Sequence, residues 1–137
     1  MKLTRSLEQA VCIITLLSTQ DNMAPLASDA ISQRLQVSSS YLKKIMRKLV
    51  VQNIIRSVSG NNGGFSLAKN PKDITLLEIV EAVESDLASY PNTGLIRTVF
   101  ADIHEGSMAS KGEKIVNNAF SEADNAWKKI LKKTDCG

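Results

Sequence analysis

The sequence predicts a mainly α-helical protein with one β-hairpin and a long C-terminal helix. Apolar residues recur at helical spacing in several segments, whereas residues 54–68 alternate with a period of two around a glycine-rich run. The chain has 137 residues, of which 43% are apolar and 23% charged. That length suits one hydrophobic core with an extended arm, and the composition is ordinary for a folded domain.

The apolar runs of the sequence are short. The most apolar one, Val11 to Leu17, falls well below the roughly 20 residues that cross a bilayer. Glu8 is also out of place in the apolar region of a signal peptide. We therefore expect a cytoplasmic protein without a membrane partner.

Cysteine and histidine are scarce in this chain. Cys12, Cys136 and His104 are too few for a four-ligand zinc site, and two cysteines make no disulfide framework. We expect no metal and no other cofactor. Cys12 lies in an apolar helical stretch and is expected to be buried, whereas Cys136 is expected in a frayed tail. A Cys12–His104 nucleophile and base is the weakest of the functions considered, so no enzyme is predicted.

Three helices are expected in the first half of the chain. The first runs from Lys2 to Asn22 without Gly or Pro. Ser28 can cap a short second helix, and the serine run 38–40 can cap a third. About three residues connect the second helix to the third, so the two must cross steeply, as in a helix-turn-helix.

The third helix combines an apolar stripe with a basic surface. The stripe consists of Leu42, Ile45, Met46 and Leu49. The basic residues of the other faces are Lys43, Lys44, Arg47 and Lys48. A solvated face would explain such charges, but the second helix of a helix-turn-helix enters a DNA major groove. Residues 1–72 hold ten lysines and arginines against three acids, which favours the same polyanionic partner.

Residues 54–68 predict a β-hairpin with a turn at Gly60 to Gly64. Asn62 and Gly63 are expected to supply the positive φ angles of that turn. A phosphate-binding glycine loop is the alternative, but the run matches neither the dinucleotide nor the Walker pattern, and no helix follows it. A hairpin directly after a recognition helix is the wing of a winged helix, whose amides and asparagines can reach phosphates or the minor groove.

Two further helices are expected. Thr75 and Glu78 form a capping box that begins a helix through about Glu84. Residues 86–112 lack sustained periodicity and predict a connector with one short helix. The helix at 113–134 carries an apolar stripe spaced by three and four residues, which the small domain can hardly cover. The stripe residues are Val116, Phe120, Ala123, Trp127 and Ile130.

These elements predict three parts: a winged helix-turn-helix DNA-binding domain at 1–85, a connector at 86–112 and a dimerisation helix at 113–134. A two-fold homodimer is the simplest way to bury the last stripe. Packing of that helix on its own domain is the alternative.

The chain resembles the Rrf2 family of bacterial winged-helix transcription regulators over nearly its whole length. The matching stretches, in order, are MKLTRSLEQAVCIITLL, SSSYLKKIMRKLVVQNII, GNNGGFSLAK and PKDITLLEIVEAVE. The resemblance implies a homodimer held by the long C-terminal helix, which binds a palindromic operator, usually as a repressor.

The sequence departs from the family pattern at two places. Cluster-binding members carry three cysteines in the connector, where they hold an iron-sulfur cluster, whereas residues 86–112 contain none. His104 alone cannot replace these thiolates, so the chain resembles a cluster-free member. Many relatives have an arginine just before the first wing glycine, where this sequence has Ser59. Minor-groove contacts would then fall to Arg56, Asn61 or Asn62.

The leading hypothesis is a sequence-specific regulator that binds double-stranded DNA as a homodimer. The start of the third helix is expected at the base edges, and its later lysines and arginine at phosphates. The residues expected to contact DNA are Arg5, Ser38, Ser39, Ser40, Tyr41, Lys43, Lys44, Arg47, Lys48, Arg56, Asn61, Asn62 and Gly63. The alternative is a dimeric sensory or protein-interaction module without specific DNA binding. The signals considered are a small molecule, a partner protein and oxidation of Cys12, of which the apolar surroundings of Cys12 disfavour the last.

Overall fold

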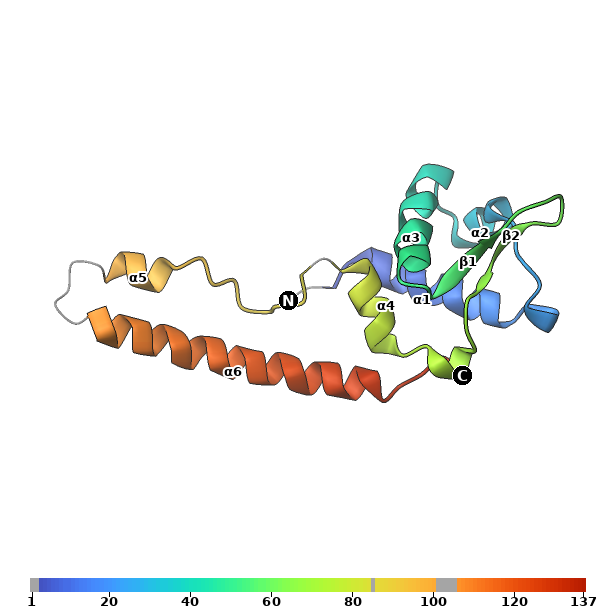
Figure 1. The fold of residues 1–137 in the computed structure, drawn as a ribbon. Helices are drawn as coiled ribbons and strands as arrows, with labels where there is room; N and C mark the ends of the chain where they lie inside the picture. The colour runs from blue at the N-terminus through green and yellow to red at the C-terminus, as the bar shows by residue number, and fades with distance from the viewer. Residues whose placement is uncertain (1–2, 85, 101–105) are drawn as a thin grey trace. The chain divides into compact units, whose positions relative to one another are not determined.

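The computed structural model describes residues 3–84, 86–100 and 106–137. The chain divides into two units, Leu3–Ser85 together with Leu131–Gly137, and Asp86–Ile130 (Figure 1). His104 and Lys2, which figured in the expectations above, lie outside the described residues.

The first unit is helical apart from a two-stranded antiparallel sheet, so the predicted fold class is confirmed. Its elements are α1 (Arg5–Ser18), η1 (Asp21–Met23), α2 (Ser28–Leu35), α3 (Ser39–Val51), β1 (Ile55–Val58), β2 (Gly64–Leu67), η2 (Pro71–Asp73) and α4 (Leu76–Val83). The core combines apolar residues of all four α-helices and both strands.

Helix α1 is shorter than expected and ends at Ser18 rather than near Asn22. The hydroxyls of Ser18 and Thr19 donate to carbonyls of the preceding turn. Asn22 and Met23 then take left-handed φ angles of 54° and 57°, which an α-helix cannot contain. The sequence showed no Gly or Pro here, but polar side chains end the helix instead.

The expectation that Cys12 is buried was wrong, because Cys12 is exposed on α1. The buried face of α1 is formed by Ala10, Ile13, Ile14 and Leu17. Successive residues turn by about 100° around a helix, which puts Cys12 on the opposite side from these four. The apolar run around Cys12 therefore marked a helix with a buried face, not a helix buried all round.

The connection between α2 and α3 is a tight turn. Gln36 has a left-handed φ of 57°, and the Ser32 hydroxyl donates to the Val37 carbonyl at 2.7 Å. Ser38 caps α3 as predicted, because its Oγ accepts from the Tyr41 amide at 3.3 Å. Ser28 does not cap α2: it is already the first helical residue, and Ala27 occupies the cap position without a side-chain bond.

The predicted hairpin pairs Ile55 with Leu67 at its base and Val58 with Gly64 at its end. The positive φ angles fall on Gly60 (107°) and Gly64 (154°) and not on Asn62 or Gly63, which corrects the expected turn geometry. The Gly63 amide donates to the Gly60 carbonyl at 3.0 Å, so Asn61 and Asn62 form the tip of an ordinary four-residue turn.

A third segment pairs with the wing where the sequence suggested none. Leu26 and Phe65 exchange two backbone hydrogen bonds of 2.9 Å. A Cβ at Gly64 would lie 2.3 Å from the Leu26 carbonyl oxygen, so this approach needs a glycine. The pairing attaches the wing to the segment that precedes α2.

Helix α4 begins at the predicted place, and Thr75 Oγ1 accepts from the Glu78 amide at 3.2 Å. The capping box is only half formed, because the Glu78 side chain makes no return bond to the amide of Thr75. The Glu78 carboxylate pairs with Lys69. At the other end of α4, Glu84 Oε1 accepts from both the amide (2.9 Å) and the hydroxyl (2.8 Å) of Thr4. The beginning of α1 and the end of α4 are therefore joined.

The C-terminal residues are docked rather than frayed, contrary to expectation. Asp135 forms a β-bridge with Thr75, and the Cys136 amide donates to the carbonyls of Pro71 and Ile74. Cys136 is half-buried against the core, and this burial raises the pKa of its thiol. The backbone of η2 and the start of α4 supplies these bonds, so no periodic sequence pattern announced them.

The second unit consists of the connector, which contains the expected short helix as α5 (Leu95–Val99), and most of α6 (Gly106–Lys132). Helix α6 begins earlier than residue 113 and so includes the last part of the expected connector. Buried Glu113 fastens the two: Asn92 Nδ2 donates to its Oε1 at 3.0 Å, and Arg97 Nε lies 2.9 Å from its Oε2. In the described ranges, no helix is long and apolar enough to span a bilayer.

Candidate nucleic-acid interface

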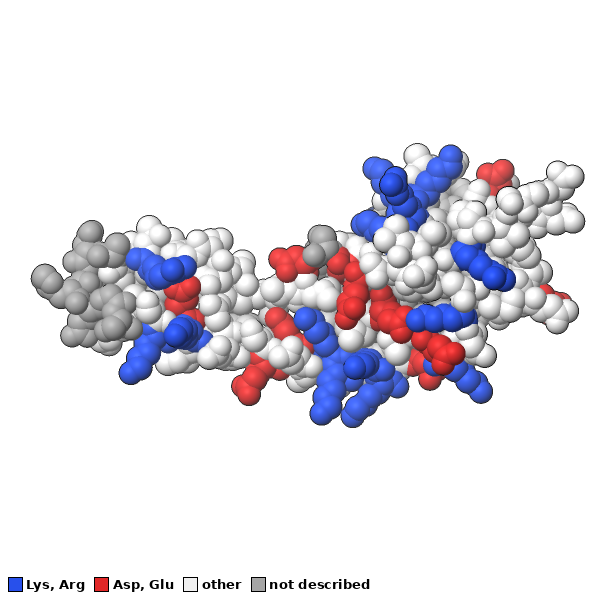
Figure 2. Space-filling view, viewed as in Figure 1, with Lys and Arg blue, Asp and Glu red and all other residues white. Residues whose placement is uncertain are grey.

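Helix α3 separates its apolar and basic residues onto different faces. Leu42, Ile45, Met46 and Leu49 are all buried, as the stripe predicted. Lys43, Lys44, Arg47 and Lys48 are exposed. Figure 2 shows lysine and arginine side chains gathered over α3, whereas acidic side chains of the same unit gather around α4. The packing of α3 on the core therefore forces its charges into solvent as one positive surface.

The N-terminal end of α3 is also accessible. Ser38, Ser39, Ser40 and Tyr41 are exposed there. The positive end of the helix dipole attracts anions at such a position, and no acid occupies the first turn. This end can therefore meet either a phosphate or the polar edge of a base.

Tyr41 is held in place by the first helix. Its hydroxyl shares a hydrogen bond of 3.0 Å with the hydroxyl of Ser6. Ser6 follows Arg5, which is exposed in the first turn of α1. The structure thus brings the start of α1 to the start of α3, and Arg5 joins the predicted residues of α3 in one neighbourhood.

Ser6 is a residue that the sequence reasoning missed. A serine in the first turn of an amphipathic helix is ordinary, and nothing in its local pattern identifies a partner 35 positions away. The Ser6–Tyr41 pair depends on how α1 and α3 cross in the core.

Lys48 differs from the other basic residues of α3. Its Nζ donates to the Val83 carbonyl at 3.4 Å, at the C-terminal end of α4. A cation is stabilised there by the negative end of the helix dipole. The Lys48 ammonium group therefore also links α3 to the end of α4.

The wing presents a polar tip on a fixed base. Asn61 and Asn62 are exposed at the tip, and Ser59 is exposed beside it. Arg56 Nε donates to the buried Ser66 Oγ of the opposite strand at 3.2 Å, which anchors this arginine on the sheet. A Cβ at Gly63 would lie 2.2 Å from the Val58 carbonyl oxygen, so this glycine is needed to close the turn.

The residues expected at a dimer interface have different surroundings on α6. Ala123 and Ile130 are exposed, and Ile130 has 67% of its surface accessible. Val116 and Trp127 are half-buried. Phe120 stacks on Tyr90 of the connector with ring centroids 5.0 Å apart. Part of the predicted stripe is thus engaged within the second unit.

Another face of α6 is apolar and exposed. Its residues follow one another at spacings of seven, four, four, three and four positions and so share one side of the helix. They are Met108, Ile115, Ala119, Ala123, Ala126 and Ile130. Ala123 and Ile130 belong both to this face and to the predicted stripe. The sequence alone did not show that the connector covers the side of α6 that carries Phe120.

Comparison with known proteins gives a consistent result. Residues 3–136 match the family model Rrf2, described as an iron-dependent transcriptional regulator. The chain is 39% identical over 132 residues to YwgB of Bacillus subtilis (strain 168), named as a candidate HTH-type transcriptional regulator, covering 96% of this chain and 80% of YwgB. It is 33% identical to YffB of Lactococcus lactis, which has the same kind of name, covering 96% of this chain and 81% of YffB.

A solved structure shares the fold. CymR, titled the global cysteine regulator of B. subtilis, superposes with a TM-score of 0.69 at 19% identity, covering 99% of this chain and 93% of that one. At this identity the likeness concerns the fold alone.

The residues of this chain do not fit the iron-sulfur cluster that an iron-dependent regulator of this type would hold. Such clusters are bound by several cysteine thiolates, and the sequence has only Cys12 and Cys136. Cys12 lies on α1 and Cys136 in the docked C-terminal segment, both outside the connector. Over the described part of the chain, no three His, Cys, Asp or Glu residues are grouped to bind a metal.

Proposed function

The chain belongs to the Rrf2 family of transcriptional regulators, and we propose that it binds an inverted-repeat operator as a homodimer and represses transcription. The observation that carries this proposal is the surface of α3, with Lys43, Lys44 and Arg47 exposed beside an uncovered helix N-terminus. A recognition helix needs both features, since cations neutralise phosphates and the first turn approaches the bases.

The residues of this surface divide into two roles. Ser39, Ser40, Tyr41 and Lys43, at the start of α3, contact base edges in the major groove. Lys44, Arg47 and the neighbouring Arg5 bind phosphates, which supply affinity and register without sequence information. Lys48 contributes less, because its ammonium faces the Val83 carbonyl.

The wing supplies a second contact with the same duplex. The exposed tip residues Asn61 and Asn62 offer side-chain amide donors to phosphates or to the minor groove, and Gly63 closes the turn that presents them. Arg56 contributes from its anchored position on β1. Serine, lysine and asparagine discriminate bases less sharply than a bidentate arginine, so DNA shape carries part of the specificity.

The homodimer forms through the exposed apolar face of α6. Ile115 and Ile130, with about two thirds of their surfaces accessible, lie on it together with several alanines. A continuous apolar face of this kind on a helix is usually covered by a partner. An identical helix is the economical partner, because one face then serves both subunits. Two recognition helices about 34 Å apart then require an operator with two-fold symmetry.

The proposal is tested by selecting binding sites from a randomised pool of duplex DNA with the purified full-length chain. Enrichment of an inverted repeat with half-sites about one helical turn apart is expected. Repression is then measured with a reporter that carries the selected site between promoter and start codon. Recovery of no common sequence would reject specific DNA binding and favour a protein-interaction module instead.

A further inference from the structure

A cleft of about 420 Å³ lies within the second unit, between the connector and α6. The stacked rings of Tyr90 and Phe120 form part of its wall. Its other polar lining residues are Asp86, Asn92, Thr93, Asn117, Ser121 and Asp124. The volume suits a small organic molecule, and the mixture of ring surface and polar groups is typical of ligand sites.

The electrostatics of this cleft favour a cation. Two carboxylates line it, and among the described residues no lysine or arginine does. The carboxylates are fixed in place: Asp124 Oδ2 accepts from the Ser89 amide at 3.1 Å, and Asp86 Oδ1 accepts from the Ala88 amide at 3.0 Å. Hydrogen bonding from Ser89 lowers the pKa of Asp124, with a smaller contribution from Lys128, so this carboxyl is ionised at neutral pH.

We propose that this cleft binds a small organic amine, whose ammonium group pairs with Asp124 and whose carbon skeleton lies against Phe120. The Asp86 carboxylate adds to the negative potential, and Asn117 and Ser121 offer further hydrogen-bond partners. An aromatic wall adds cation–π attraction for the same ligand. An anionic ligand would meet two carboxylates, and among the described residues no lysine or arginine lines the cleft, which disfavours such a ligand.

The site lies on a different side of α6 from the proposed dimer face. Asn117, Ser121 and Asp124 recur at spacings of four and three residues, whereas Ile115, Ala119 and Ala126 follow another line along the helix. Ligand binding and dimerisation can therefore occur together. An effect of the amine on operator affinity would rest on the proposed function, but binding itself does not.

Binding is measured by two-dimensional amide NMR on the full chain, with 2-phenylethylamine as the probe and 2-phenylethanol and phenylacetate as its neutral and anionic counterparts. The amine is expected to cause saturable shifts at the cleft residues, and the two counterparts are not. Asp124→Asn should weaken amine binding about tenfold, because a charge-assisted hydrogen bond is lost. Asn117→Asp, which adds a carboxylate to the lining, should strengthen binding about threefold or more.

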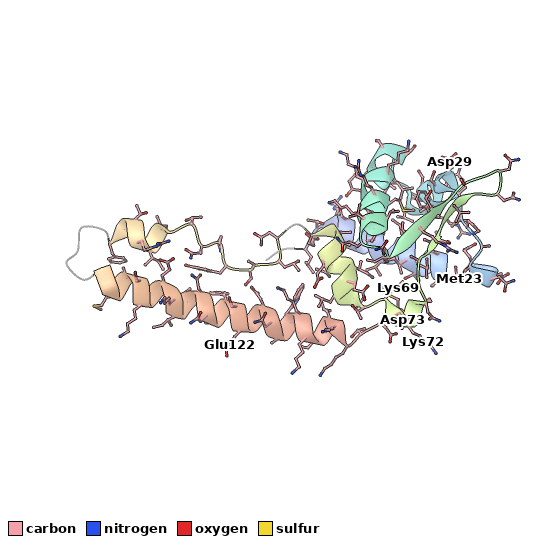
Figure 3. All side chains as sticks on the ribbon, viewed as in Figure 1. Met23, Asp29, Lys69, Lys72, Asp73 and Glu122 are labelled. Carbon is pink, nitrogen blue, oxygen red and sulfur yellow. The ribbon has the colours of Figure 1, made fainter. Side chains whose placement is uncertain are left out.

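Glu122→Gln is the matched control. Glu122 lies on the same helix two positions before Asp124 and points away from the connector, as Figure 3 shows. Its replacement should leave the amine affinity within about twofold, because distant exposed charges are screened. The proposal would be overturned if 2-phenylethanol bound as tightly as the amine or if the shifts caused by the amine did not saturate. It would also be overturned if Glu122→Gln and Asp124→Asn lost the same amount of amine affinity. Should Asp124→Asn release Ser89 and disturb the connector, a failure of Asn117→Asp to tighten binding would overturn it independently.

A protein with Lys44→Ala and Arg47→Ala separates this proposal from the preceding one. These residues lie on α3, outside the cleft, so amine binding should be unchanged in the variant whatever happens to its DNA affinity.

Discussion

The hydroxyl oxygens of Ser6 on α1 and Tyr41 on α3 lie 3.0 Å apart, so the first helix fixes a side chain at the start of the recognition helix. Tyr41 retains 37% of its surface exposed despite this contact. The hydrogen bond therefore restrains the ring without removing it from solvent. A restrained ring loses less conformational freedom on binding than a mobile one.

Ser6→Ala should lower operator affinity by roughly two- to tenfold, since a typical hydrogen bond contributes about 0.5–1.5 kcal/mol. Tyr41→Phe should cause a loss of similar size. The double variant should lose little more than either single variant, because both remove the same bond. Fluorescence anisotropy at one fixed salt concentration measures all three. Fully additive losses would show that the two hydroxyls act separately.

Lys44→Ala combined with Arg47→Ala should flatten the dependence of log K on log salt by about 1.8, because each phosphate contact contributes about 0.9 to that slope. Affinity measured at several salt concentrations gives the slope. Lys72→Ala is the control, since this exposed lysine belongs to η2 and not to α3 (Figure 3). An unchanged slope in the double variant would refute the phosphate role of both residues.

Gly64→Ala should lower the free energy of unfolding by at least about 2 kcal/mol, because the added Cβ would meet the backbone of Leu26. Gly112→Ala is the contrasting change. No atom of the same chain lies within 4 Å of a Cβ placed there, and Gly112 is inside α6, so the stability of a single chain should rise by roughly 0.5–1 kcal/mol. Thermal and urea denaturation compare the two. Similar effects of both changes would contradict the close approach at Gly64.

Ile115→Asp should convert the proposed dimer into a monomer, because it puts a carboxylate on the exposed apolar face of α6. Asn118→Asp adds the same group one turn along, at an exposed position off that face, and should leave the dimer intact. Light scattering coupled to size-exclusion chromatography measures the mass. If both variants are monomers, or if both are dimers, the dimer interface does not lie on this face of α6.

The two cysteines should differ in their rate of alkylation. Cys12 is exposed, whereas Cys136 is half-buried with a raised pKa, so less of the Cys136 thiol is ionised at neutral pH. The thiolate is the reactive form. The Cys136→Ser variant retains only Cys12 and should react quickly with iodoacetamide. The Cys12→Ser variant retains only Cys136 and should react slowly. Faster reaction of Cys136 would mean that the C-terminal segment is undocked in solution.

Local patterns predicted the parts of the fold that depend on neighbouring residues. The stripe from Leu42 to Leu49, the Ser38 cap and the Thr75 cap all lie within one or two helical turns, and each is confirmed. Alternation around the glycine run likewise located the wing. Period and capping chemistry are properties of short segments, so a single sequence contains them.

Contacts between distant segments could not be predicted in this way. The Leu26–Phe65 bridge, the docking of Cys136 and the Ser6–Tyr41 bond each join residues far apart in sequence through backbone groups or common polar side chains. Cys12 shows the same limit, since an apolar run does not reveal which side of its helix meets the core. Tertiary packing decides these features.

The bond from Thr4 to Glu84 makes the segment between them a closed module, and the docked tail re-enters that module beside Thr75. The connector and most of α6 are thus an insertion in the chain. The segments just before and just after this insertion, at Glu84 and Asp135, are both hydrogen-bonded within the winged-helix unit. Such an insertion can be lengthened, shortened or exchanged without rebuilding the module that carries it. The sequence of the connector and of α6 can therefore change while α3 and the wing stay as they are.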